Sequence, residues 1–299
     1  MPYKSLLRVL ISSLLIFLLI YNVNVKDTLT ILKASNYSYL ALSAFFVFLN
    51  IYISSVRTGY ILSLYKYKTN LYYLTKLYLV GNFYNNFLPT QMGGDVYKAY
   101  KLSKYLKKES ADKTMSHLTH ASFAVFVDRL SGLLVLVAVL SITVFITLGA
   151  LYFFLYTLLL ILLYFFYNIF FKKYSAKFSI IGKLNNTIKI LTTNKKAMIN
   201  ILSSALLVQV CSILSQVFCF YAIGVNINLL YSFLYFPAVI LLGLVPSVNG
   251  IGVQDSAFVY FFKNLGILEQ YSLASSILYH LIRLVTSLLG GGLVLFKKV

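Results

Sequence analysis

Three arginines stand out among the residues that could do chemistry, because each lies in or at the edge of an apolar segment. Lysine supplies most of the positive charge of this chain, whereas Arg57, Arg129 and Arg283 are three of only 4 arginines. A guanidinium stays charged and binds phosphate or carboxylate through two parallel hydrogen bonds. An ionisable residue at membrane depth is costly and indicates a functional site. We therefore predict anion binding by Arg129 and Arg283, and place Arg57 near the inner end of its helix as a weaker candidate.

Acidic residues are rare, with 7 Asp and Glu in 299 residues, and a structural ion pair is the alternative role for each arginine. Asp128 and Arg129 are adjacent, so on a helix their side chains point about 100° apart. We expect Asp128 to pair with Arg283 instead. Asp95 and Asp255 each follow glycines, and we predict that they cap helices that begin there.

These two aspartates belong to two similar interruptions of apolar sequence, one after Pro89 and one after Pro246. Broken backbone at membrane depth is tolerated only where it is buried in protein or lines a wet cavity. Broken helices in corresponding halves of a transporter indicate its binding site. The free N–H groups at such helix starts also suit an anion. The glycines that would supply them are Gly93, Gly94, Gly250 and Gly252.

Two polar stripes are predicted to lead to this site. Asn82, Asn85 and Asn86 fall on one helical face. Gln209, Ser212 and Gln216 form a second stripe at helical spacing. The predicted substrate-binding residues are Arg129, Arg283, Asp128, Asp95, Lys98, Asn82, Asn86, Gly93, Gly94, Gly250, Gly252 and Asp255.

No metal, cofactor or catalytic residue is predicted. His117 and His120 have the spacing of metal ligands on a helix, but no carboxylate or cysteine follows at ligand spacing. His280 is expected to be packed rather than catalytic. The sequence contains no G-x-S-x-G, Walker A, C-x-x-C or D-x-D motif. The chain is therefore not expected to be an enzyme.

Composition defines the class of protein. Hydrophobic residues make up 60% of the chain, charged residues 11%, and the mean hydropathy is +0.83. Several apolar runs are long enough to cross a hydrocarbon core of roughly 30 Å. We predict an all-α polytopic integral membrane protein with one transmembrane domain, residues 1–299, and no soluble catalytic domain. Its net charge of +19 fits the positive-inside rule and anionic lipids better than nucleic acid.

About six full transmembrane helices and two re-entrant or broken elements follow from the apolar pattern. Lysine-rich loops, 98–113 and 172–196, are expected in the cytoplasm, and a short loop with Lys26, Asp27 and Lys33 outside. Both termini are then cytoplasmic, in the plasma membrane. The predicted full helices are 6–23, 39–62, 122–148, 151–171, 198–221 and 271–296, and the re-entrant elements are 71–97 and 231–266.

The order of these elements repeats. Each half reads helix, helix, re-entrant break, helix, and the second half starts from the opposite side of the membrane. We therefore hypothesise an inverted repeat with halves 1–149 and 150–299, whose two breaks meet near the midplane. Coincidence between two Pro-Gly turns is the alternative.

Four blocks of this sequence resemble the transmembrane domain of the lysylphosphatidylglycerol synthase family, which is also described as flippase-like. They are 85–98 with Asn85-Asn86-Phe87-Leu88-Pro89, 127–133 with Val127-Asp128-Arg129, 246–255 with Gly252-Val253-Gln254-Asp255, and 279–291 around Arg283. Lys98 and Asp255 stand where the family usually has Arg and Glu. The resemblance implies a domain that handles lipid or polyprenyl-linked headgroups, while synthase activity belongs to a separate soluble domain where members have one.

Three functions follow as hypotheses. The first is a lipid translocase that binds an anionic phospholipid or polyprenyl-linked headgroup between the two breaks. The second is a membrane-embedded transferase with Asp95 or Asp128 as base. The third is a non-catalytic accessory subunit that recruits envelope biosynthesis proteins through its basic loops. No nucleic-acid partner is expected.

Overall fold

The computed structural model describes residues 25–87, 93–109, 117–158, 161, 194–243 and 252–296, and this part of the chain is all-α. Four of its helices are long and apolar enough to cross a membrane. They confirm the predicted spans 39–62, 122–148, 198–221 and 271–296. The four are α3 (Tyr37–Ser63), α6 (His117–Leu148), α9 (Lys195–Ala222) and α12 (Glu269–Leu295).

The other two predicted spans lie largely outside the described residues. Residues 6–23 lie outside the described part of the chain, and of 151–171 only 151–158 and 161 are described, as helix. Gly149, with φ 89°, directly follows α6. A positive φ is readily adopted by glycine, so the predicted boundary between the halves coincides with a residue suited to a change of chain direction.

The interrupted segments form shorter helices. They are α4 (Leu71–Phe87) and α5 (Gly93–Glu109) in the first half, and α10 (Leu229–Leu242) and α11 (Val253–Lys263) in the second. At 1.5 Å per residue, the 17 residues of α4 reach about 26 Å and the 14 of α10 about 21 Å. Both lengths are below the roughly 30 Å of a hydrocarbon core. They fit elements that enter the membrane without crossing it.

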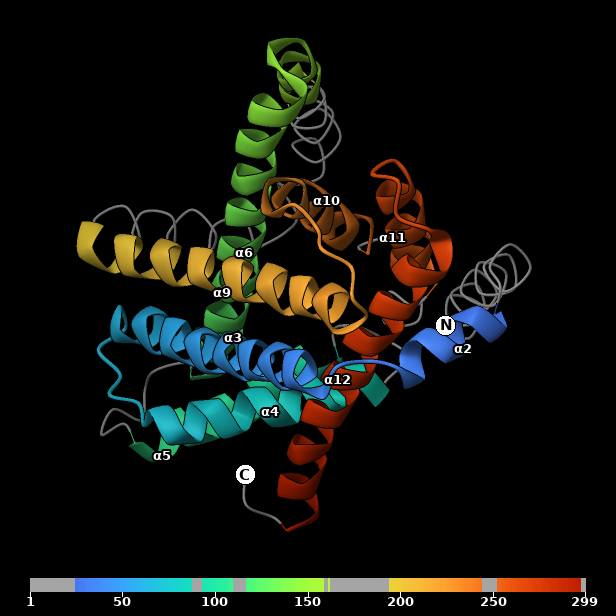
Figure 1. Ribbon diagram of the computed structural model, residues 1–299. Helices are drawn as coiled ribbons and strands as arrows, with labels where there is room; N and C mark the ends of the chain where they lie inside the picture. The colour runs from blue at the N-terminus through green and yellow to red at the C-terminus, as the bar shows by residue number, and fades with distance from the viewer. Residues whose placement is uncertain are drawn as a thin grey trace, which may run out of the picture.

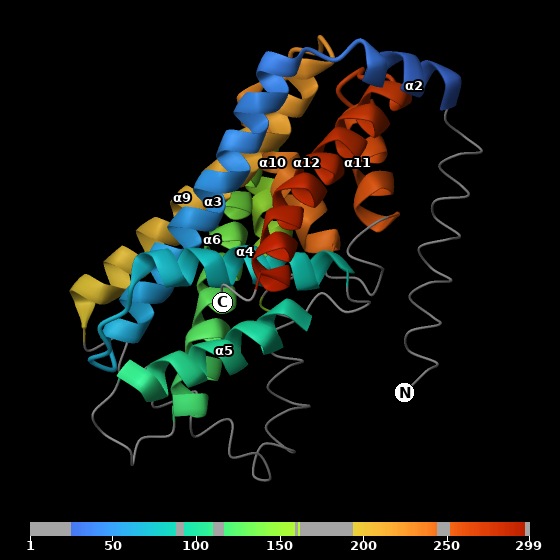
Figure 2. The ribbon, with the colours of Figure 1, turned by 90° about the horizontal axis from the view of Figure 1, so that it is seen from below.

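Two predicted loops are wrong, because both segments are helical. Most of the basic segment 98–113 belongs to α5, whose Leu102 and Leu106 are one turn apart and buried while its lysines mostly face outward. The predicted outer loop forms α2 (Val25–Lys33), with Asp27 in its first turn and Lys33 in its last, as the helix dipole favours. Figure 2 shows α2 and α5 at opposite ends of the molecule.

The helices α3 and α9 pack along their length, and Figure 1 shows them side by side. They are antiparallel, because Ser43 contacts Ser215 while Asn50, further along α3, contacts the earlier Val208. Ser43 Oγ donates to the Ser215 carbonyl at 2.8 Å, and Asn50 Nδ2 donates to the Val208 carbonyl at 2.9 Å. Side-chain to backbone bonds of this kind hold helices together where lipid supplies no hydrophobic drive.

The helix contacts have the pattern that an inverted repeat would produce. Among these eight helices, exchanging α3 with α9, α4 with α10, α5 with α11 and α6 with α12 turns each contacting pair into another contacting pair. For example, α4 packs on α12 as α10 packs on α6, and α5 packs on α6 as α11 packs on α12. The repeat itself remains a prediction.

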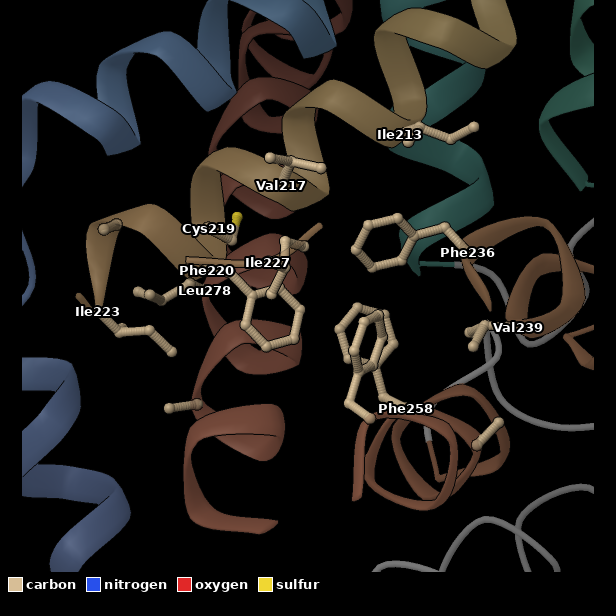
Figure 3. Packing of buried hydrophobic residues seen from close by; sticks show 14 residues of the cluster. Ile213, Val217, Cys219, Phe220, Ile223, Ile227, Phe236, Val239, Phe258 and Leu278 are labelled. Carbon is tan, nitrogen blue, oxygen red and sulfur yellow. The ribbon is translucent and has the colours of Figure 1, made fainter. Parts of the chain in front are cut away.

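An aromatic cluster anchors the second pair of short helices. Phe220 of α9, Phe236 of α10, and Phe258 and Phe262 of α11 are buried together, and Figure 3 shows Phe220, Phe236 and Phe258 converging. The ring centroids of Phe220 and Phe262 are 4.8 Å apart. Such ring pairs add to area burial, so the cluster holds α10 and α11 against α9.

Large apolar side chains cover the outside of the long helices. Phe45, Ile142, Leu206 and Val285 are each exposed by 45% or more. A contiguous apolar exterior of this size is unfavourable in water and is expected where lipid is the solvent. The protein is thus a polytopic membrane protein.

Candidate functional site

A cavity of about 630 Å³ lies between the two halves of the molecule. The helices α3, α4, α5, α6, α9, α10, α11 and α12 all contribute to its lining. Seven of the predicted site residues line it, namely Asn82, Asn86, Asp95, Lys98, Asp128, Arg129 and Arg283. The structure therefore brings together residues that are up to 201 positions apart, from Asn82 to Arg283.

Asp95, in the first turn of α5, forms ion pairs with two cations, Arg129 and Lys98. Arg129 Nε and Nη2 donate to its two carboxylate oxygens at 2.9 and 2.8 Å. Lys98 Nζ lies 2.8 Å from Asp95 Oδ1 and 4.4 Å from the centre of the Tyr78 ring. The Lys98 side chain is buried, whereas that of Arg129 is 55% exposed. Arg129 thus keeps an open face after pairing with Asp95.

A second ion pair is deeply buried and differs from our expectation. Arg57 Nε donates to Asp128 Oδ1 at 2.7 Å, and both side chains are about 5% exposed or less. The predicted pairing of Asp128 with Arg283 is therefore wrong. Arg57 lies near the end of α3, which ends at Ser63, as expected, and it faces Asp128 of α6. The scarcity of arginine in the sequence could have indicated that Arg57 is a stronger candidate for the site.

Arg57 and Arg283 both have unused binding capacity. Arg57 Nη1 is buried and has no hydrogen-bond partner among the described atoms. A buried donor without a partner costs free energy and calls for an explanation such as an absent ligand. No carboxylate of the described residues lies within ion-pair distance of Arg283, whose guanidinium sits 5.7 Å from the centre of the Tyr279 ring.

The charge of the cavity favours an anion. Arg57, Lys98, Arg129 and Arg283 line it against the two carboxylates of Asp95 and Asp128. With His280 neutral, this leaves an excess of two positive charges. Asn82, Asn85 and Gln254 add amide donors to the same lining. At low local dielectric, such an excess attracts an anionic group strongly.

The backbone N–H groups at the helix starts are already engaged. Asn85 Oδ1 accepts a hydrogen bond from the N–H of Gly94 at 2.8 Å. Asp255 Oδ2 accepts one from the N–H of Gly252 at 2.9 Å, which confirms Asp255 as a cap. The predicted cap role of Asp95 stays a prediction, because the residues just before Gly93 lie outside the described part of the chain, while its oxygens bind the cations described above. In this structure, the N–H groups of Gly94 and Gly252 are therefore already used within the protein.

Three of the predicted glycines, Gly93, Gly94 and Gly252, do not line the cavity, and Gly250 lies outside the described residues. Gly93 is the first residue of α5. Gly94 packs so closely on the carbonyl of Gly81 that a Cβ there would overlap it. Gly252, with φ 86°, allows the turn into α11. The roles of Gly94 and Gly252 in this structure are structural.

His280 was missed as a cavity residue. Its Nε2 lies 3.1 Å from Asp255 Oδ1, and Ser276 Oγ donates to the same oxygen. His280 lines the cavity one turn before Arg283. The spacing of these two basic residues on one face of a helix was the available signal.

Both predicted polar stripes line the cavity. Asn82, Asn85 and Asn86 face it from α4, and Gln209, Ser212 and Gln216 from α9. Gln209 Nε2 donates to the carbonyl of Gly132 at 3.1 Å, and Asn86 Nδ2 to that of Arg283 at 3.4 Å. These amides connect the two halves across the site.

The rim beside Arg129 is apolar. Phe126 and Leu133, on the same helix, line the cavity and are 44% and 39% exposed. A polar interior bordered by apolar residues that face lipid suits an amphiphile. Its headgroup would enter while its chains stay in the membrane.

The histidines outside the cavity form a different cluster. Tyr67 Oη lies 3.0 Å from Nδ1 of both His117 and His120. Within the described residues, no group of three or more His, Cys, Asp or Glu is placed to hold a metal ion.

A family comparison identifies the chain. The family model described as "Lysylphosphatidylglycerol synthase TM region" matches residues 5–291. The chain belongs to this family. The match spans every residue that lines the cavity, so the site lies wholly within the family's transmembrane region. A comparison with curated proteins found no match. Membership of the lysylphosphatidylglycerol synthase transmembrane family makes this a membrane protein of lipid-related processes.

Proposed function

We propose that this protein is a lipid translocase that binds an anionic, phosphate-bearing headgroup in the cavity between its two halves. The observation that carries the proposal is the pair of arginines with unused donors, Arg57 and Arg283, in one positively charged cavity. Both a phospholipid and a polyprenyl-linked headgroup offer the phosphate oxygens that these groups bind.

Each cation has a distinct role in the proposal. Arg283 has no carboxylate partner among the described residues, so it would bind the phosphate without first breaking an ion pair. Arg57 would add Nη1 while Asp128 holds its Nε. Arg129, fixed by Asp95 and half exposed, would supply long-range attraction at the entrance.

The two breaks provide the means of alternating access. Each half presents a short helix pair to the cavity, and the halves meet along the seam of α3 and α9. Rocking of one half against the other would expose the cavity first to one leaflet and then to the other. We place the protein in the plasma membrane with both termini in the cytoplasm, as the lysine distribution favours.

Lipid retention tests the binding step. Protein purified in mild detergent is examined by native mass spectrometry as wild type, Arg283→Ala and Lys263→Ala. Lys263 is the matched control, because it is a cation of α11 that lies outside the cavity with its side chain 66% exposed. We expect wild type and Lys263→Ala to retain an anionic lipid and Arg283→Ala to lose most of it. Loss of one hydrogen-bonded charge costs about 1.5–3 kcal/mol, or roughly tenfold or more in affinity.

Equal retention by all three proteins would contradict the proposal and favour the accessory-subunit hypothesis. Transport itself is tested in proteoliposomes with a fluorescent phosphatidylglycerol that a membrane-impermeant reductant quenches only in the outer leaflet. Wild-type protein should allow quenching beyond the outer-leaflet fraction, and Arg283→Ala should reduce that excess. Quenching equal to that of protein-free liposomes would count against translocation of this lipid.

A further inference from the structure

The two halves of the molecule hold equivalent aspartates with different partners. Asp95 in the first turn of α5 pairs with Arg129 of α6, the long helix that follows. Asp255 in the first turn of α11 pairs with His280 of α12, again the long helix that follows. Each pair joins the helix after a break to a long helix on which it packs.

The two pairs differ in one chemical property. An arginine keeps its charge at all physiological pH values, so the Asp95–Arg129 pair is permanent. A histidine is the side chain whose charge ordinarily changes between about pH 5 and 8. The Asp255–His280 pair is therefore the one that can gain or lose a proton. An ionisable pair at membrane depth is a typical element of a proton pathway.

The geometry defines where that proton binds. An ionised carboxylate only accepts hydrogen bonds, so His280 Nε2 carries a hydrogen and donates to Asp255 Oδ1 at 3.1 Å. A proton from water would then bind at Nδ1, converting the neutral imidazole to imidazolium. The side chain of His280 is 20% exposed and lines the cavity, which gives the proton access.

Few charged groups of the described residues surround His280. On α12 itself, Arg283 lies one turn away and Tyr279 is adjacent, while α11 supplies Asp255. From α3, Arg57 lines the same cavity, and from α4 Tyr78 does. The cavity residues of α9 are uncharged, and Lys26, Asp27 and Lys33 of α2 do not line the cavity.

Arg283 connects this pair to the proposed lipid site. A protonated His280 and Arg283 repel each other across one helical turn. An anionic headgroup on Arg283 would remove that repulsion and attract the imidazolium. By reciprocity, protonation of His280 must strengthen anion binding by the same factor.

We propose that His280 and Asp255 form a proton-binding site whose occupancy is coupled to anion binding at Arg283. The inference rests on the proposed function and adds a coupling ion to it. Headgroup and proton bind together, and loss of the proton weakens both the headgroup site and the contact between α11 and α12.

Binding measured at two pH values tests this coupling. The probe is a short-chain phosphatidylglycerol, whose phosphodiester stays charged throughout, added to purified protein at about pH 5.5 and about pH 8, near the two ends of the histidine range. We expect wild-type affinity to be about tenfold higher at the lower pH, within the usual range of such couplings. Calorimetry in two buffers of different ionisation enthalpy should show proton uptake on binding near pH 7.

Two substitutions at one position separate charge from structure. His280→Arg keeps a cation beside Asp255 and should bind at the low-pH level at both pH values. His280→Gln keeps a donor without charge and should bind at the high-pH level at both. His120→Gln is the matched control, because His120 lies outside the cavity, and it should behave as wild type.

The outcomes are distinct. A pH dependence that persists in both His280 variants, or its absence in wild type, would overturn the coupling and leave the lipid site standing. No binding of the probe by wild type at either pH would overturn the proposed function for this lipid class and the coupling with it. Thermal unfolding of each variant shows whether a loss of binding reflects loss of the fold.

Discussion

At the scale of single residues, the buried pair of Arg57 and Asp128 is the most consequential contact. Both side chains are almost fully removed from solvent, and Nε and Oδ1 are 2.7 Å apart. Removing one partner of a buried pair leaves an uncompensated charge, which costs more than the pair itself contributes. The pair therefore fixes α3 to α6 in the first half.

We predict that Asp128→Ala destabilises the protein by about 3–5 kcal/mol. The comparison is Glu269→Ala, which breaks the exposed pair of Lys263 and Glu269 and should cost under about 1 kcal/mol. Thermal unfolding in detergent, followed by intrinsic tyrosine fluorescence or a thiol-reactive dye, measures both. Similar shifts in the two variants would show that Asp128 is not buried with Arg57.

The double variant Arg57→Met with Asp128→Leu tests the same point in the opposite direction. Replacing both charges by apolar groups removes the desolvation cost, so most of the stability lost in Asp128→Ala should return. Anion binding should fall in the double variant, because Arg57 Nη1 is gone. Recovery of stability together with unchanged lipid retention would remove Arg57 from the binding site.

At the scale of elements, close helix crossings depend on small residues. Gly290 of α12 lies against the backbone of α4 at Leu79 and Val80, and Gly291 lies against the ring of Phe83. A Cβ at Gly290 would overlap the carbonyl of Leu79. Small residues of this kind let membrane helices approach. The α4–α12 contact brings the end of α4 beside the helix that carries His280 and Arg283.

We predict that Gly290→Ala destabilises the fold by about 1–3 kcal/mol, because the backbone of α4 must move. Gly292→Ala, two residues along the same helix, has no atom within 4 Å of its new Cβ. It should be neutral or slightly stabilising, since alanine favours a helix interior over glycine by about 1 kcal/mol. Melting temperatures of the two variants measure the difference, and equal values would refute the close approach.

The sequence predicts elements better than it predicts contacts. The four long helices appear where the apolar runs place them, and each begins and ends within a few residues of the prediction. The basic segment 98–109 was predicted to be a loop because lysines dominate it, while its buried face consists of Lys98, Leu102 and Leu106. Burial by tertiary packing decides such a short, weakly apolar helix, and a single sequence does not show it.

For the candidate site, too, the sequence predicts the elements better than the contacts. The short helices that flank the two breaks and both polar stripes line one cavity, as the pattern indicates. The pairing of the charged residues was not predicted correctly. Asp128 of α6 binds Arg57 of α3, and the sequence does not define how these two helices are rotated relative to each other. His280 was missed for a similar reason, since its partner Asp255 lies on another helix.

At the scale of the whole molecule, the proposed orientation follows from the ends of the helices. The basic helix α5 and the short helix α2 lie at opposite ends of the molecule (Figure 2). Anionic lipids and the positive-inside rule place α5 at the cytoplasmic face. Lys263, at the end of α11, is then outside.

We predict opposite labelling of single cysteines placed at Lys104 and Lys263, both of which are exposed. The native thiols Cys211 and Cys219 are buried, and a background with both replaced removes any remaining signal. A membrane-impermeant maleimide added to intact cells should label Lys263→Cys but label Lys104→Cys only after lysis. Labelling of both from one side would exclude the inverted arrangement.

The contact between α3 and α9 also affects how the chain inserts into the membrane during synthesis. Ser215, the partner of Ser43, is synthesised 172 residues after it, and Val208, the partner of Asn50, is synthesised 158 residues after it. At about 5–20 residues per second, the polar face of α3 spends roughly ten to thirty seconds in the membrane before α9 is synthesised. During that interval its hydroxyl and amide groups face lipid or a helper protein. Biogenesis therefore favours an insertase that shelters the polar face of α3 until α9 has been made.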